Sequence, residues 1–195
     1  MNDFGLYFNL GYKHIADLKA LDHILFVMAL CIRYQFADWR KILILITAFT
    51  IGHSITLALS VLNLVQYSIK WIEFLIPVTI IITAISNVFV KKFVFRAKFP
   101  VIYFLALIFG LVHGLGFSSY LKSLLGTDKN IVAELLAFNL GLEAGQLLIV
   151  ACVLLISFIF VNILKCNRRE YLLYISGGIF ALALKMVIEN IPFKL

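Results

Sequence analysis

The sequence predicts an all-α integral membrane protein, with a single transmembrane domain over residues 1–195 and a bundle of six membrane-spanning helices. Two observations lead to this prediction. Hydrophobic residues make up 63% of the 195 residues and the mean hydropathy is +1.04, which lies far outside the range of soluble globular domains. The apolar residues also form six runs of about twenty residues, the length that a helix needs to cross the hydrocarbon core of a bilayer.

Short polar or basic connections separate the six runs. In order along the chain, the runs cover residues 18–34, 41–62, 71–90, 100–119, 132–164 and 171–190. The first run is short if its helix begins after the charged stretch at residues 19–22, which makes residues 10–18 a candidate for a separate interfacial or re-entrant segment. The fifth run is longer than a perpendicular helix needs, so we expect it to tilt or to project from the membrane.

The distribution of charge predicts the orientation of the bundle. Three of the five connections are basic, and their basic residues are Arg33, Arg40, Lys41, Lys91, Lys92, Arg96, Lys98, Lys165, Arg168 and Arg169. The positive-inside rule assigns such connections to the cytoplasm, so both termini are expected outside. Because the net charge of +7 comes from short clusters and not from one continuous basic face, it predicts no nucleic-acid partner.

Ionisable side chains inside the apolar runs are the first candidates for function. Such groups are costly within a membrane and usually face a protein interior or an aqueous cavity. The chain has four histidines and three acidic residues in these surroundings: His14, His23, His53, His113, Asp22, Glu73 and Glu143. When each is placed along its helix at about 1.5 Å per residue, they fall toward the outer side of the bundle, so we expect one shared polar site there.

The segment before the second run holds three of these residues. Asp22 and His23 are adjacent and point about 100° apart on a helix, and an aspartate that orients a metal-bound imidazole is a common arrangement. His14 is nine positions before His23, which sets the two on opposite faces of a continuous helix. His14 therefore reaches the same site only if the chain turns between them.

A polar stripe runs along the fifth predicted span. Asn139, Glu143 and Gln146 are spaced by four and then three residues, so their side chains lie on one face of a helix. Gly-x-x-x-Gly pairs occur in the same span, at Gly141 and Gly145, and beside His113; such pairs permit close approach of neighbouring helices. The stripe is either part of the shared site or a structural hydrogen-bond network between helices.

Imidazole with carboxylate is a ligand set that suits zinc, nickel, copper or iron. The sequence therefore predicts a divalent transition-metal site, with a metal-free proton relay as the alternative. The first candidate ligands are His23, His53, His113, Asp22 and Glu143, and the further candidates are His14, Glu73, Asn139 and Gln146. The three cysteines contain no Cys-x-x-Cys pair and are expected to be packing residues.

Four segments of the chain resemble the HupE/UreJ family of small bacterial membrane proteins. They are GYKHIADLKALDHILFVMAL, FTIGHSITLALS, GLVHGLGF and FNLGLEAGQLL. The resemblance implies a multi-pass protein of the bacterial inner membrane that handles a metal, as a nickel permease or as an accessory protein of hydrogenase and urease. The family's first-helix signature is a histidine followed, after five residues, by Asp-His; here seven residues separate His14 from Asp22.

The leading hypothesis from sequence is a metal-cation permease that captures a divalent ion, with nickel and zinc as the candidate metals, at a site open to the outside. The cytoplasmic halves of the spans offer few polar residues and no second set of ligands, which is an unusual design for a transporter. Two alternatives therefore stay open. One is a metal-binding accessory or sensor protein without turnover.

The other alternative is an intramembrane zinc metalloenzyme, a hydrolase or transferase that acts on a lipid or on a membrane-protein segment. In it three histidines would hold the zinc ion, which would activate a water molecule. Glu143 or Asp22 would be the general base, and Ser54 or Asn139 could stabilise an oxyanion.

Overall fold

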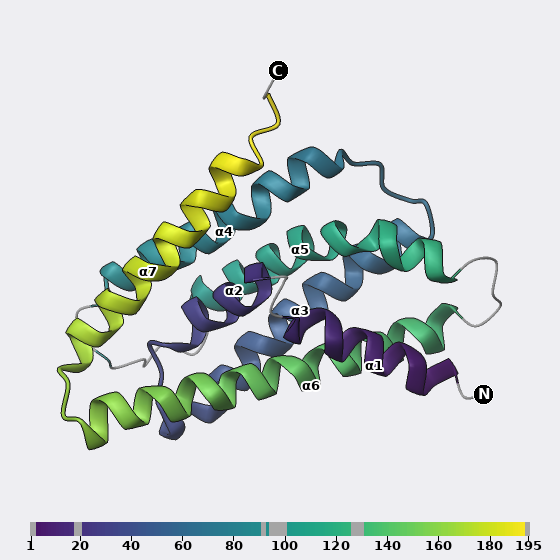
Figure 1. Cartoon of the computed structure of the whole chain (residues 1–195). Coiled ribbons are helices and arrows are strands. Elements are labelled where there is room, and N and C mark those ends of the chain that lie inside the picture. The colour runs from purple at the N-terminus through teal and green to yellow at the C-terminus, as the bar shows by residue number, and fades with distance from the viewer. Residues whose placement is uncertain (1–2, 18–20, 91–92, 94–100, 126–130, 194–195) are drawn as a thin grey trace.

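The computed structural model describes residues 3–17, 21–90, 93, 101–125 and 131–193, and every regular element in these residues is helical (Figure 1). In chain order the elements are α1 (Asp3–Ala16), α2 (Leu21–Cys31), the 3-10 turn η1 (Phe36–Asp38), α3 (Trp39–Val61), α4 (Ile69–Val88), α5 (Val101–Leu125), α6 (Ile131–Phe158), the π-helical turn η2 (Ile159–Ile163) and α7 (Arg168–Glu189).

Five helices of the described residues are long and apolar enough to cross a membrane. They are Phe36–Val61, Ile69–Val88, Val101–Leu124, Ile131–Ile163 and Arg168–Glu189, and they correspond to the second through sixth predicted spans. The fifth predicted span is a continuous helical stretch through η2, as its length indicates. The predicted all-α membrane architecture is therefore confirmed for these five helices.

The first predicted span differs from the structure. The helix here, α2, has 11 residues and is about 16 Å long, roughly half of the 30 Å thickness of a bilayer core. The segment before it is a separate helix, α1, of 14 residues. Figure 1 shows α1 along α6, whereas α2 lies on the far side of the break and packs on α4, α6 and α7.

Glycines set the closest helix pairs, α1 with α6 and α3 with α5. A Cβ atom added to Gly141 would overlap the carbonyl oxygen of Phe8 on α1, and one added to Gly110 would overlap the carbonyl oxygen of Phe49 on α3. Because there is no space for a side chain at these contacts, the backbones touch directly. The close approach predicted from the Gly-x-x-x-Gly pairs is confirmed.

The described basic connections lie at one end of the bundle. In Figure 1 the connections that follow α2 and η2 lie at the same end of the bundle as the end of α4, and we call this the basic end. Its described basic residues are Arg33, Arg40, Lys41, Lys165, Arg168 and Arg169. Lys91, Lys92, Arg96 and Lys98, which the orientation prediction also uses, lie outside the described residues.

The buried apolar residues form two clusters. The first lies in the half of the bundle toward the basic end and includes Phe26, Phe49 and Phe109. The second lies in the other half and includes Ile15 and Phe138. The four histidines lie between the two clusters along the helices, so the polar site separates two apolar layers.

Candidate metal centre

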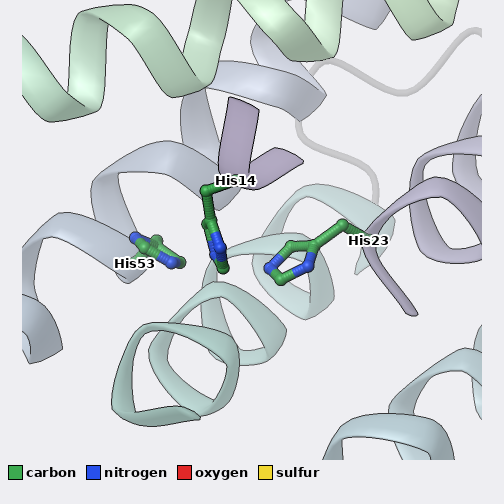
Figure 2. Close-up of side chains that lie close together, drawn as sticks. All are labelled: His14, His23 and His53. Carbon is green, nitrogen blue, oxygen red and sulfur yellow. The ribbon is translucent and has the colours of Figure 1, made fainter. Parts of the chain in front are cut away.

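Three imidazoles from three helices converge between these layers. His14 is near the end of α1, His23 near the beginning of α2, and His53 in the second half of α3. Figure 2 shows the three rings close together, and one ring nitrogen of each lies within 4.8 Å of the others. We call these three residues the histidine group.

The break between α1 and α2 places His14 in this group. On a continuous helix His14 and His23 would point in opposite directions, because nine residues correspond to two and a half turns. The first helix instead ends at Ala16 and the second begins at Leu21, so the two rings meet with their centroids 4.6 Å apart. The two histidines therefore lie on separate helices, and His14 lies beside His23.

Four ring nitrogens of the group are buried without a hydrogen-bond partner among the described residues. His23 is 4% exposed and His53 is fully buried. The unpartnered atoms are Nε2 of His14, Nε2 of His23, and both Nδ1 and Nε2 of His53. Buried polar atoms are nearly always hydrogen-bonded, and each one left unpartnered costs about 1–3 kcal/mol, so this arrangement indicates a ligand.

Asp22 orients the ring of His23. Nδ1 of His23 lies 3.1 Å from Oδ1 of Asp22, and an ionised carboxylate can only accept a hydrogen bond. Nδ1 of His23 therefore carries the hydrogen, which leaves the lone pair of the neutral ring on Nε2, the atom without a partner. Asp22 thus has the position of a group that supports a metal-bound imidazole from behind.

His113 is a fourth imidazole beside the group. It is 1% exposed, and its ring centroid lies 5.3 Å from that of His23. The hydroxyl of Thr79 donates its only hydrogen to the carbonyl of Ile76 at 2.7 Å, so at 3.1 Å it accepts from Nε2 of His113. The lone pair of His113 is then on Nδ1, which has no partner among the described residues.

The polar stripe of α6 faces α3 and not the histidine group. Glu143 accepts a hydrogen bond from Thr47 at 2.8 Å, and Gln146 accepts one from Thr50 at 2.9 Å. The amide of Asn139 donates to a carbonyl of its own helix. Glu143 and Asn139 also line an open pocket of about 290 Å³ between α3 and α6. Glu143 and Gln146 thus bond to α3, whereas Asn139 bonds within α6.

Glu73 lies apart from the group as well. Its side chain is exposed on α4, and it is not among the residues whose ligand atoms converge. The nine candidate ligands from sequence therefore divide into three that converge, two beside them (Asp22 and His113), and four that lie elsewhere.

The histidine group is covered differently on its two sides. An open pocket of about 380 Å³ has His14 in its wall, together with Lys13, Asp17 and Phe117. Toward the basic end, the ring centroids of Phe26 and Phe49 lie 5.0 and 5.2 Å from that of His113. The two phenylalanine centroids are 5.0 Å apart. His14 thus lines a pocket in the half away from the basic end, and aromatic rings lie on the side toward the basic end.

Neutral imidazole nitrogens are ligands for zinc, nickel and copper. Nitrogens bound to one ion at about 2.0 Å lie roughly 3.3 Å apart in a tetrahedral site, so small side-chain rotations would bring the group to metal-binding geometry. The donor set fits a divalent transition metal with three imidazoles and a fourth beside them.

Sequence reasoning missed the residues that support the histidines. Thr79 on α4 and Phe117, whose ring centroid lies 3.7 Å from that of His14, were not among the candidates. A hydroxyl in a span carries little signal, because such groups commonly bond to the carbonyl of the preceding turn. Phe117 looks like any other apolar residue of a membrane helix.

Comparison with known proteins adds one finding. A family model described as HupE / UreJ protein matches residues 1–190. No curated protein and no solved structure gives a match. The match covers nearly the whole chain, including all four histidines and every helix described above.

Proposed function

Because the chain belongs to the HupE/UreJ family, a family of multi-pass membrane proteins linked to metal handling, we propose that it is a permease for a divalent transition-metal cation, with nickel as the first candidate. The ion is captured by His14, His23 and His53. The observation that carries this proposal is the convergence of one ring nitrogen of each residue within 4.8 Å. The same three residues hold four buried ring nitrogens without a hydrogen-bond partner among the described residues, whereas buried polar atoms of a structural network are nearly always bonded.

The neighbouring residues complete the capture site. His113 presents Nδ1 as a fourth ligand after a small movement, and Asp22 holds the lone pair of His23 toward the ion. An all-imidazole site favours nickel, zinc and copper over magnesium and calcium, which prefer oxygen ligands. The site therefore selects its cargo by ligand type.

The broken helix supplies the sixth crossing in this proposal. α1 and α2 are about 21 and 16 Å long, so together they are long enough to span a bilayer core of about 30 Å. Binding sites between half-helices are typical of secondary transporters, in which the break exposes ligands at mid-membrane. His14 and His23 flank this break.

The orientation of the bundle in the membrane determines the side from which the ion is captured. The positive-inside rule places the basic end in the cytoplasm and both termini outside. The pocket beside His14 is the outer opening, where Lys13 and Asp17 are exposed. Phe26 and Phe49 form the closed inner barrier, which has to part before the ion can pass.

Nickel uptake into liposomes that contain the purified protein tests the proposal. Wild-type protein should transport nickel, and His53→Ala should abolish uptake together with nickel binding. Glu73→Gln, which changes an exposed residue outside the histidine group, is the matched control and should retain both. Uptake by the His53 variant at the wild-type rate would rule out this site as the transport site.

A second candidate is an intramembrane zinc enzyme. The observation in its favour is the open pocket between α3 and α6, where the polar Ser54 and Glu143 lie beside Ile51 and Leu136, apolar side chains that are about half exposed. Ser54 directly follows His53 on α3. In this candidate a lipid substrate enters through this pocket, between α3 and α6. Bound, non-exchanging zinc without ion flux, and a Glu143→Gln variant that keeps its metal but loses turnover, would support this candidate over the permease.

A further inference from the structure

A second pocket, of about 210 Å³, lies at the basic end between the α2–α3 connection, the end of α6 and the start of α7. Its lining includes the apolar side chains of Phe36, Leu154 and Phe158. It also includes the polar side chains of Arg168 and Tyr171. A pocket lined by both apolar side chains and an arginine suits an amphipathic anion.

Three arginines at this end bond to neutral acceptors. Arg33 donates to Oδ1 of Asn87 at 2.8 Å, Arg168 to the carbonyl of Arg33 at 2.9 Å, and Arg169 to the carbonyl of Asn87 at 3.1 Å. Each of these acceptors is neutral. Within the described part of the chain, none of the three arginines forms an ion pair.

Arg168 is held by an aromatic ring and a backbone carbonyl, unlike the nearby Lys41, which pairs with a carboxylate. Lys41 pairs with Asp38 at 2.7 Å, whereas the guanidinium of Arg168 lies 3.9 Å from the ring centroid of Phe93. Stacking and the bond to the Arg33 carbonyl hold Arg168 in place. Its charge is therefore presented to the pocket in a fixed position.

The helical turn that follows α6 beside the pocket is not α-helical. Residues Ile159–Ile163 form a π-helical turn, in which the N–H of Leu164 donates to the carbonyl of Ile159 at 2.9 Å. This wider turn contributes Asn162 to the pocket lining. Such turns are rare and frequently occur at functional sites.

From these observations we propose that the pocket binds one anionic phospholipid, with its phosphate on Arg168 and its acyl chains along Phe158 and Phe36. The pocket lies at the ends of α6 and α7, where headgroups meet the helices, and basic pockets between helices at this level bind anionic lipid. The exposed Asn162 and the hydroxyl of Tyr171, which lies 3.3 Å from Ser157, supply further hydrogen bonds. The apolar side chains in the lining favour a lipid over a free inorganic anion. This proposed lipid site is independent of the metal site.

Native mass spectrometry of the full chain with added phosphatidylglycerol or phosphatidylethanolamine tests the proposal. Wild-type protein should retain phosphatidylglycerol about tenfold more strongly than phosphatidylethanolamine. Both lipids offer a phosphate to Arg168, but the ammonium group of phosphatidylethanolamine cancels the net negative charge that the guanidinium attracts. Arg168→Gln should remove this preference. Arg40→Gln is the matched control, because Arg40 is exposed at the same end, stacks on Trp39 and does not line the pocket.

A second variant keeps the test decisive if Arg168→Gln fails to fold. Asn162→Trp fills the pocket from an exposed position and leaves all three arginines in place, so it should also reduce phosphatidylglycerol binding by about tenfold. Equal retention by the wild type and the Asn162 variant would overturn the proposal. Displacement of phosphatidylglycerol by millimolar inorganic phosphate alone would assign the site to a free anion and overturn the lipid assignment.

Discussion

His14 and His23 lie on different helices, and their ring centroids are 4.6 Å apart although the two residues are only nine positions apart in the sequence. The helix break between Ala16 and Leu21 makes this contact possible. The break also leaves two half-helices with different main neighbours, α6 for α1 and α4 for α2. Relative movement of these half-helices would change the spacing of the two imidazoles and so couple metal binding to conformation.

We predict that His14→Ala weakens nickel binding as strongly as His53→Ala does. Both residues contribute a ligand atom to the same group, so each loss should exceed the roughly 10- to 100-fold effect of removing a group that only orients a ligand. Isothermal titration of the detergent-purified protein measures the affinity. Wild-type affinity in the His14 variant would show that the ion binds elsewhere.

Asp22→Asn should weaken metal binding by about 10- to 100-fold without unfolding the protein. The amide can no longer act as an ionised acceptor for Nδ1 of His23, so the ring loses its fixed orientation. The measurement is a competition titration with a chelator of known affinity. Circular dichroism of the same sample is the control for helix content, and an unchanged affinity would argue against the orienting role.

Two substitutions, one that removes the hydroxyl group and one that keeps it, test the role of Thr79. Thr79→Val removes the acceptor for Nε2 of His113 and should weaken metal binding by about tenfold, a typical lower value for a supporting group. Thr79→Ser keeps the hydroxyl and should bind metal like the wild type. If the two variants behave alike, the hydrogen bond to His113 has no part in the site.

Two glycine substitutions test the helix packing. Gly110→Ala should destabilise the protein by about 1–3 kcal/mol, because the new methyl group would overlap the backbone of α3 and force the helices apart. Gly177→Ala on α7 is the control: a Cβ atom there meets no atom within 4 Å, so the change should be neutral or stabilise the helix by up to about 1 kcal/mol. Thermal unfolding in detergent compares the two variants, and equal melting temperatures would contradict the packing.

The positions of most helices could be predicted from the sequence because hydropathy and length act locally. The predicted span at residues 71–90, for example, agrees with α4 at Ile69–Val88 within a few residues. The first span could not be predicted in the same way, since a run of apolar residues does not show where the backbone breaks. That depends on which neighbours each half-helix can pack against.

The polar stripe shows the same limit at the level of side chains. The spacing of Glu143 and Gln146 correctly predicted one shared face, and both bond to threonines of α3. Which neighbour this face meets depends on the rotation of α6, and close contacts at Gly141 and Gly145 set that rotation against α1. A periodic pattern identifies a face but not its partner.

The sequence by itself determined the membrane environment, five of the helices and the basic charge of alternate connections between the spans. It also determined the presence of four imidazoles at a similar depth in apolar segments. These properties follow from the transfer free energies of individual segments, so they need no knowledge of neighbours. Only the tertiary structure decided that His14 joins His23 and His53, that Glu143 faces α3, and that Thr79 directs His113. These relationships depend on backbone breaks and on helix rotation, which packing at close glycine contacts fixes between segments far apart in the chain.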